Sequence, residues 1–189
     1  MILKTKLFGH VYEFKSIREV MAKANEEKSG DKLAGIAAET AEERVAAKVV
    51  LSNLTLNDLR NCPAVPYEED EVTRIIQDSV NETIFNEYKN MTVAEFREWL
   101  LDTQTTPDMI RRASRGLTSE IVAGVCKLMS NLDLIYAAKK MRVTAHCNTT
   151  IGLPGTFSSR LQPNHTTDDP NGIIASVMEG LSLGCGHAV

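Results

Sequence analysis

Three polar side chains, Arg160, Gln162 and Asn164, alternate with other residues at the end of the stretch NTTIGLPGTFSSRLQPN, residues 148–164. The small and β-branched residues before them predict a strand that Leu-Pro-Gly interrupts. Alternation along a strand places Arg160 and Gln162 on one face. Polar groups at the carboxyl end of a barrel strand are where ligands bind. By itself the pattern more often signifies a structural polar pair at a strand end, and we expect Asn164 to shape the following turn.

His146 and Cys147 are adjacent and are both metal-ligating residue types. A zinc site needs three or four convergent ligands at recognisable spacing, and the other candidates are scattered along the chain. We therefore predict no metal site. The four cysteines have no C-x-x-C spacing and are expected to be free thiols.

The composition is that of a folded domain rather than a disordered or basic chain. Hydrophobic residues make up 43% and charged residues 24% of 189 residues, and the net charge is −4. An acidic chain is a poor binder of phosphate backbones, so nucleic acid is excluded as the main partner. No apolar run is long enough to span a membrane, and the N-terminus lacks the pattern of a signal peptide. We expect a cytoplasmic protein that does not bind membranes.

The first 140 residues are expected to form a β-hairpin followed by a helical region. Residues 3–14 show β-type residues around Gly9 and His10, and helical spacing begins after Ser16 and is stopped by KSGD. Two S/T-x-x-E capping boxes, Thr40 with Glu43 and Thr92 with Glu95, precede apolar-periodic runs.

Two longer helices are predicted in the same region. One covers residues 68–88 and has an acidic start that suits the helix dipole, and the other covers residues 117–141 with Lys139 and Lys140 in its last turn.

Residues 141–189 form the second predicted domain. The broken strand is followed by turn residues, by Asp168 or Asp169 as a helix cap, and by a helix through IIASVMEGLSLG. CGHAV then looks like the start of another strand. Because a strand and its crossover helix need a parallel neighbour, we expect the chain to be the front part of a larger α/β fold.

The stretch that contains Arg160 resembles the first barrel strand and loop of the large subunit of ethanolamine ammonia-lyase. The resemblance extends in order over essentially the whole chain, through LFGHVYEFK, SGDKLAGIAA, ERVAAKVVLS, YEEDEVTRIIQDSVNET, RGLTSE, SNLDLIYAAKKM and VMEGLSLGCG. It implies an N-terminal region followed by the first strand-loop-helix unit of a (β/α)8 TIM barrel that stops at the second strand. The chain departs from the family pattern Gly-Asp-Ala-Val at His187.

The resemblance further implies an adenosylcobalamin-dependent radical enzyme that converts ethanolamine to acetaldehyde and ammonia. It implies a small partner subunit, a large-subunit homo-oligomer and, in some organisms, a bacterial microcompartment. The family's other substrate-binding residues and most of its cobalamin contacts lie beyond this chain or on the small subunit. We therefore assign no cofactor-binding residue here and expect this chain alone to be inactive.

By the same resemblance, Arg160 and Gln162 contact the substrate. An ammonium placed about 4 Å from a guanidinium costs on the order of 4 kcal/mol at an effective dielectric constant near 20. Arg160 is therefore expected to face the hydroxyl of ethanolamine and to act as the catalytic group, while the Gln162 carbonyl suits the ammonium. The alternative is a non-catalytic module in which the N-terminal helices dock on a partner subunit.

Overall fold

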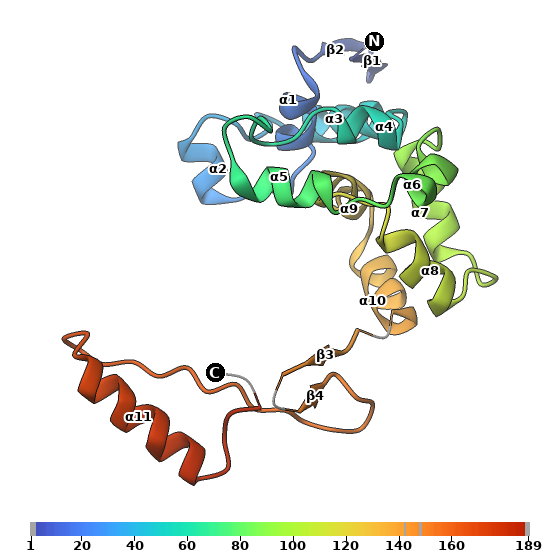
Figure 1. Ribbon diagram of the computed structural model, residues 1–189. Helices are drawn as coiled ribbons and strands as arrows, with labels where there is room; N and C mark the ends of the chain where they lie inside the picture. The colour runs from blue at the N-terminus through green and yellow to red at the C-terminus, as the bar shows by residue number, and fades with distance from the viewer. Residues whose placement is uncertain (1–2, 142, 148, 188–189) are drawn as a thin grey trace. The chain divides into compact units, whose positions relative to one another are not determined.

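The computed structural model of the chain describes residues 3–141, 143–147 and 149–187. Its internal contacts divide the chain into two units, Met1–Met141 and Arg142–Val189, which we call unit 1 and unit 2. Unit 1 contains β1, β2 and α1–α10, and unit 2 contains β3, β4 and α11 (Figure 1). The described chain is therefore helix-rich, with two small antiparallel hairpins. The assignment of residues 1–140 to a separate domain and of residues 141–189 to the start of a barrel stays a prediction.

The predicted N-terminal hairpin is confirmed. Strands β1 (Lys4–Leu7) and β2 (His10–Glu13) pair antiparallel, from Lys4 opposite Glu13 to Leu7 opposite His10. The two turn residues, Phe8 and Gly9, have φ of 52° and 80°. Two successive positive φ angles define the tight turn that matches the twist of a hairpin, and Gly9 adopts this conformation without steric cost.

The helical region begins with α1 (Ile17–Lys23), where the Ser16 side chain accepts a hydrogen bond from the Glu19 N–H. The helix ends before KSGD, as expected, but this motif itself begins the short helix α2 (Ser29–Leu33). Asp31 in the first turn of α2 suits the positive end of the helix dipole.

Only half of the capping box predicted before α3 (Ala41–Ser52) forms. The Thr40 hydroxyl accepts from the Glu43 N–H at 3.1 Å. The Glu43 carboxylate accepts instead from the Glu39 N–H at 2.7 Å and pairs with Lys23 at 2.5 Å. The acid residue of this motif therefore links two helices in addition to fixing one end.

The second predicted capping box is complete. Thr92 and Glu95 satisfy each other's backbone N–H groups at the start of α7 (Val93–Leu101). Two further complete boxes begin α4 (Leu56–Arg60) and α10 (Asn131–Lys140), and neither was predicted.

The single helix predicted over residues 68–88 is wrong, because the chain forms α5 (Glu71–Asp78) and α6 (Glu82–Tyr88). Asn81 causes the break. Its side chain accepts from the Ile84 N–H at 3.1 Å, and its own N–H donates to the Arg115 carbonyl at 2.8 Å. These bonds replace the helical ones and turn the chain.

The single helix predicted over residues 117–141 is also wrong. After α8 (Pro107–Ser114), the chain forms α9 (Ser119–Lys127) and then α10. Ser130 and Asp133 break the run, because each accepts a hydrogen bond from the other's backbone N–H, at 3.2 and 2.9 Å. The prediction that Lys139 and Lys140 lie in the last turn is confirmed.

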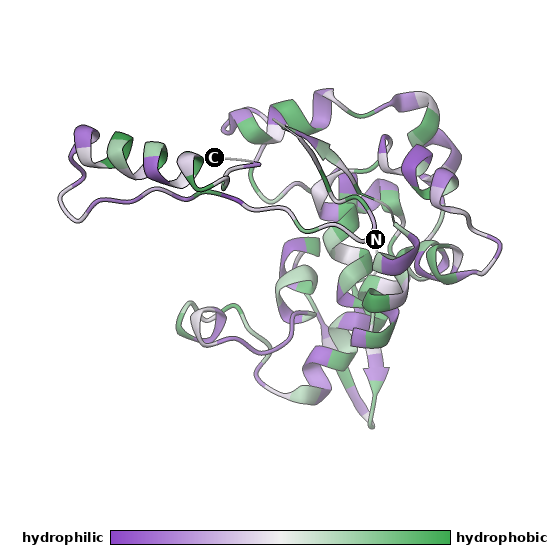
Figure 2. Cartoon of the chain, turned by 90° about the horizontal axis from the view of Figure 1, so that it is seen from below, coloured by the Kyte–Doolittle hydropathy of each residue, from purple (hydrophilic) through white to green (hydrophobic). Residues whose placement is uncertain are grey.

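A single apolar core lies in unit 1. It joins the hairpin to most of the helices, and the helices show alternating apolar and polar stretches, as one-sided burial requires (Figure 2). Its largest fully buried apolar side chains are Leu51, Leu56, Leu59, Ile121, Val20 and Val93.

Unit 2 begins with a second hairpin, in which β3 (Ala145–His146) pairs with β4 (Thr150–Ile151). The strand expected to continue past Leu-Pro-Gly is wrong in extent, since no named strand includes Arg160 or Gln162. Gly152 has a φ of 93°, and a Cβ there would lie 2.3 Å from the Val143 carbonyl oxygen, so the hairpin closes on a position that only glycine fits.

Unit 2 ends with α11 (Pro170–Ser182), and the predicted cap is Asp169, whose side chain accepts from the Asn171 N–H. Within the described parts of the chain, no helix is both long and apolar enough to cross a membrane.

Candidate functional site

The segment that carries Arg160 and Gln162 alternates in exposure. Arg160, Gln162 and Asn164 are exposed, whereas the positions between and beside them, Ser159, Leu161, Pro163 and His165, are half-buried. The three long polar side chains of the segment therefore face solvent. The half-buried residues between them face other parts of unit 2.

Helix α11 supports the half-buried positions of this segment. A Cβ at Gly180 would lie 2.5 Å from Leu161 Cδ1, and a Cβ at Gly172 would lie 2.3 Å from His165 Cδ2. At both glycines the missing Cβ lets a side chain of the segment, that of Leu161 or of His165, rest directly against the helix. Two points of contact thus fix the segment along α11 on either side of Gln162.

Ser159, which precedes Arg160, is bound to the residues that follow α11. The His187 N–H donates to the Ser159 carbonyl at 2.9 Å, and the Gly186 N–H donates to Ser159 Oγ at 3.1 Å. The Ser159 N–H donates to His187 Nδ1 at 3.0 Å. The chain after the helix therefore returns beside the segment before it, and among the described residues this pairing amounts to an isolated β-bridge at Arg160.

Arg160 and Gln162 are available to a ligand. Among the described residues, neither side chain forms a hydrogen bond or an ion pair within the chain, so their donors and acceptors face solvent. The carboxylates of unit 2 are Asp168, Asp169 and Glu179, and Asp169 is engaged as the helix cap. The exposed row can supply hydrogen-bond donors from a guanidinium and an acceptor from an amide.

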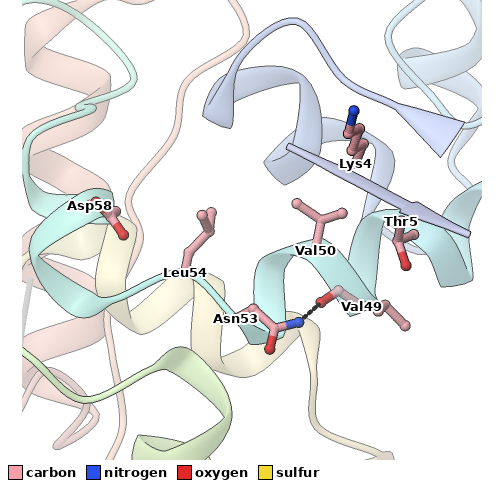
Figure 3. Close-up of a pocket in the computed structure, with 7 residues that line it drawn as sticks. All are labelled: Lys4, Thr5, Val49, Val50, Asn53, Leu54 and Asp58. Carbon is pink, nitrogen blue, oxygen red and sulfur yellow. Dashed lines mark hydrogen bonds between the residues drawn. The ribbon is translucent and has the colours of Figure 1, made fainter. Parts of the chain in front are cut away.

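Two of the pockets lined by described residues lie in unit 1. The first, of about 320 Å³, is formed by β1, the end of α3 and the start of α4, and is lined by Lys4, Thr5, Val49, Val50, Asn53, Leu54 and Asp58 (Figure 3). The second, of about 240 Å³, is lined by Arg18, Met21, Leu59, Cys62, Ala64 and Glu120. Since Arg160 and Gln162 belong to unit 2, neither pocket contains the polar groups that the sequence singled out.

Ionisable groups with shifted pKa values lie in unit 1 and serve its structure. The Thr73 backbone N–H lowers the pKa of the Asp70 carboxyl at the start of α5, and burial lowers the pKa of the Lys127 ammonium. The described residues include no group of three side chains placed to hold a metal ion.

Sequence reasoning missed the contact between Ser159 and His187. The signal was present, because His187 is the position at which the chain departs from the pattern of the family that it resembles. Its partner could not be identified from sequence, since 28 residues separate the two side chains.

Comparison with known families identifies the chain's class. A family model described as ethanolamine ammonia lyase large subunit matches residues 12–189, so the chain belongs to that family. It is similar to the ethanolamine ammonia-lyase large subunits of Escherichia coli and of Salmonella typhimurium, with 59% identity to each over all 189 residues. The chain spans 42% of the length of these relatives.

Proposed function

We propose that the chain is the amino-terminal part of the large subunit of an ethanolamine ammonia-lyase, in which Arg160 and Gln162 bind ethanolamine. The complete assembly converts ethanolamine to acetaldehyde and ammonia, and this chain alone is inactive. The observation that carries the proposal is the 59% identity over the whole chain, combined with an exposed polar row that α11 holds in place. In the complete subunit, unit 2 becomes the first strand-loop-helix element of a TIM barrel, with the row at its active-site end.

Charge decides how the substrate lies. Ethanolamine carries an ammonium at neutral pH, and like charges at close range are unfavourable. Arg160 therefore donates to the hydroxyl oxygen and stabilises negative charge that develops on it, and the Gln162 carbonyl accepts from the ammonium. The remaining substrate-binding groups, including the carboxylates that balance the ammonium, come from later parts of the subunit.

Adenosylcobalamin is the proposed cofactor, and it supplies the radical that begins the reaction. Pockets for drug-sized ligands occupy about 300–1,000 Å³, and a corrin with its nucleotide and adenosyl groups is far larger than such a ligand. The two pockets described above, of about 320 and 240 Å³, do not fit it. We therefore assign its binding groups to the rest of the large subunit and to the small subunit.

The proposed partners are the small subunit and further copies of the large subunit. The proposed location is the cytoplasm, inside an ethanolamine-utilisation microcompartment where the organism forms one.

Kinetics of the complete large subunit, assembled with the small subunit and adenosylcobalamin, test the proposal. Hydrogen bonds to charged groups contribute about 1.5–3 kcal/mol, so Arg160→Ala should lower kcat/KM for ethanolamine by about 10- to 150-fold. Arg111→Ala is the matched control, because Arg111 is an exposed arginine of unit 1, and it should leave kcat/KM within about twofold. Equal kinetics for both variants, or ammonia release by the 189-residue chain alone, would refute the proposal.

A docking module is the second candidate function. The fully buried side chains of the described residues all lie in unit 1, which is what a region that folds and binds without chemistry would need. A pull-down of the 189-residue chain with the small subunit at micromolar concentration tests this function. Binding without ammonia release favours the module, and no binding counts against it.

A further inference from the structure

His187 contacts Ser159, and the proposed function gives neither residue a role. Four hydrogen bonds or close polar contacts join Ser159 to Gly186 and His187, and two of them involve the imidazole. His187 Nδ1 lies 3.0 Å from the Ser159 N and 3.1 Å from Ser159 Oγ. The Ser159 side of the contact thus uses its N–H, its carbonyl and its hydroxyl together.

The direction of the bond to Nδ1 follows from the donor. A backbone N–H can only donate, so His187 Nδ1 must be an acceptor, and the ring proton of the neutral imidazole lies on Nε2. A side chain without an acceptor at this position would leave the half-buried Ser159 N–H without its partner in the chain.

Arg160 lies between two anchored residues. Ser159 on one side is bound to His187, and Leu161 on the other side packs against Gly180 of α11. The Arg160 side chain is exposed, and its backbone lies in an isolated β-bridge that continues the pairing of Ser159 with His187.

We propose that His187 is a positioning residue for Arg160: by accepting the Ser159 N–H, it fixes the backbone that aims the guanidinium at the substrate. This inference rests on the proposed role of Arg160. His187 does not contact the substrate, and it acts only through the segment that carries the guanidinium.

The test uses the complete large subunit with the small subunit and adenosylcobalamin. His187→Leu removes the acceptor, and His187→Asn keeps one, since its carbonyl oxygen can occupy the place of Nδ1. We expect kcat/KM for ethanolamine to fall about tenfold in His187→Leu, the low end of the cost of an unpaired N–H, and to return to within about twofold of the wild type in His187→Asn. His187→Ala is a second acceptor-free variant in case the leucine variant does not assemble.

His146→Leu is the matched control. His146 is another histidine of unit 2 whose Nδ1 lies 2.9 Å from a hydroxyl, that of Thr150, in the hairpin. Its substitution should leave kcat/KM within about twofold, since it does not touch the residues beside Arg160.

A second measurement does not depend on activity. Hydrogen–deuterium exchange of the peptide that contains Ser159 should be faster in His187→Leu than in the wild type and close to the wild type in His187→Asn. Unchanged exchange in the leucine variant, or equal losses of kcat/KM in the leucine and asparagine variants, would overturn the inference.

A double variant separates this inference from the proposed function. If His187 acts through Arg160, His187→Leu should have no further effect on kcat/KM once Arg160 is alanine. A tenfold loss that persists in the Arg160→Ala background overturns the positioning role and leaves the proposed function intact. An Arg160→Ala variant with wild-type kinetics refutes the proposed function itself.

Discussion

Unit 1 and unit 2 differ in how completely they bury their apolar side chains. Unit 1 buries side chains such as Leu51 and Leu56 completely, whereas none of the described residues of unit 2 is fully buried. In α11, Ile174, Met178 and Leu181 are 59%, 63% and 45% exposed. These three positions follow helical spacing and form one apolar face. The part that presents Arg160 is thus the part with no core of its own.

The difference indicates that the stable core of the chain lies in unit 1, whereas the residues proposed to bind substrate lie in unit 2. Burying one large apolar side chain contributes about 1.5–3 kcal/mol, and unit 2 forgoes that contribution in this chain. Its order depends on caps, on glycine contacts and on the bonds of Ser159. The order of unit 2 therefore rests on fewer buried contacts than that of unit 1.

Hydrogen exchange of the 189-residue chain gives the largest expected contrast between the units. Amides in α9, which buries Ile121 and Val125 in the core, should exchange only by near-global unfolding, and those of α11 by local opening. We expect protection in α9 to exceed that in α11 by at least about 100-fold. Similar protection in the two helices would show that unit 2 is as stable as unit 1 and would break the comparison.

Truncation of one side chain in each unit gives the next largest contrast. Leu56 is 0% exposed, so Leu56→Ala should lower the free energy of unfolding by about 2–5 kcal/mol. Ile174→Ala, at an exposed site, should change it by less than about 0.5 kcal/mol. Denaturation followed by the fluorescence of Trp99, the only tryptophan, measures the first variant, and far-UV circular dichroism, to which α11 contributes, measures the second.

The smallest expected effect is the change in the stability of unit 1 with pH. It tests how much the Asp133 carboxylate at the start of α10 contributes. The Ser130 backbone N–H, followed by the Arg97 guanidinium, lowers the pKa of the Asp133 carboxyl below its usual 3.8. A lowered pKa in the folded state means that this stabilisation is present above about pH 4 and is lost as the pH falls through the folded-state pKa.

Asp133→Asn should therefore reduce the dependence of the unfolding midpoint on pH below about pH 4, measured in the same fluorescence assay. Glu69→Gln, also in unit 1, is the control, because Glu69 is an exposed carboxylate outside the ion pairs of the described residues. An unchanged pH dependence in Asp133→Asn would mean that this cap contributes nothing to acid stability.

Local signals predicted the elements whose causes are local. The N-terminal hairpin, the box at Thr92 and the cap of α11 each depend on residues within a few positions, and each was predicted. The hairpin turn lies one residue earlier than the predicted Gly9 and His10, and the cap was predicted only as Asp168 or Asp169. The break at Ser130 had a local signal too, since Ser130 and Asp133 form a capping box within an apolar run that otherwise has one continuous helical period.

Contacts across long separations could not be predicted from one sequence. Asn81 ends a helix in part because its N–H binds the carbonyl of Arg115, and Glu43 reaches Lys23. The alternation of polar residues around Arg160 was visible in the sequence. The glycine contacts and the bonds to His187 that hold this row depend on how the chain returns after α11.

The bonds between Ser159 and His187 also set an order of folding. They close a loop of 28 residues, which costs about 3 kcal/mol of chain entropy, and no fully buried side chain of the described residues between them offsets this cost. A ribosome adds about 5–20 residues per second, so residue 187 emerges several seconds after unit 1 is complete. Unit 1 therefore has time to fold before the loop can close, and the segment that carries Arg160 is among the last parts of this chain to become ordered.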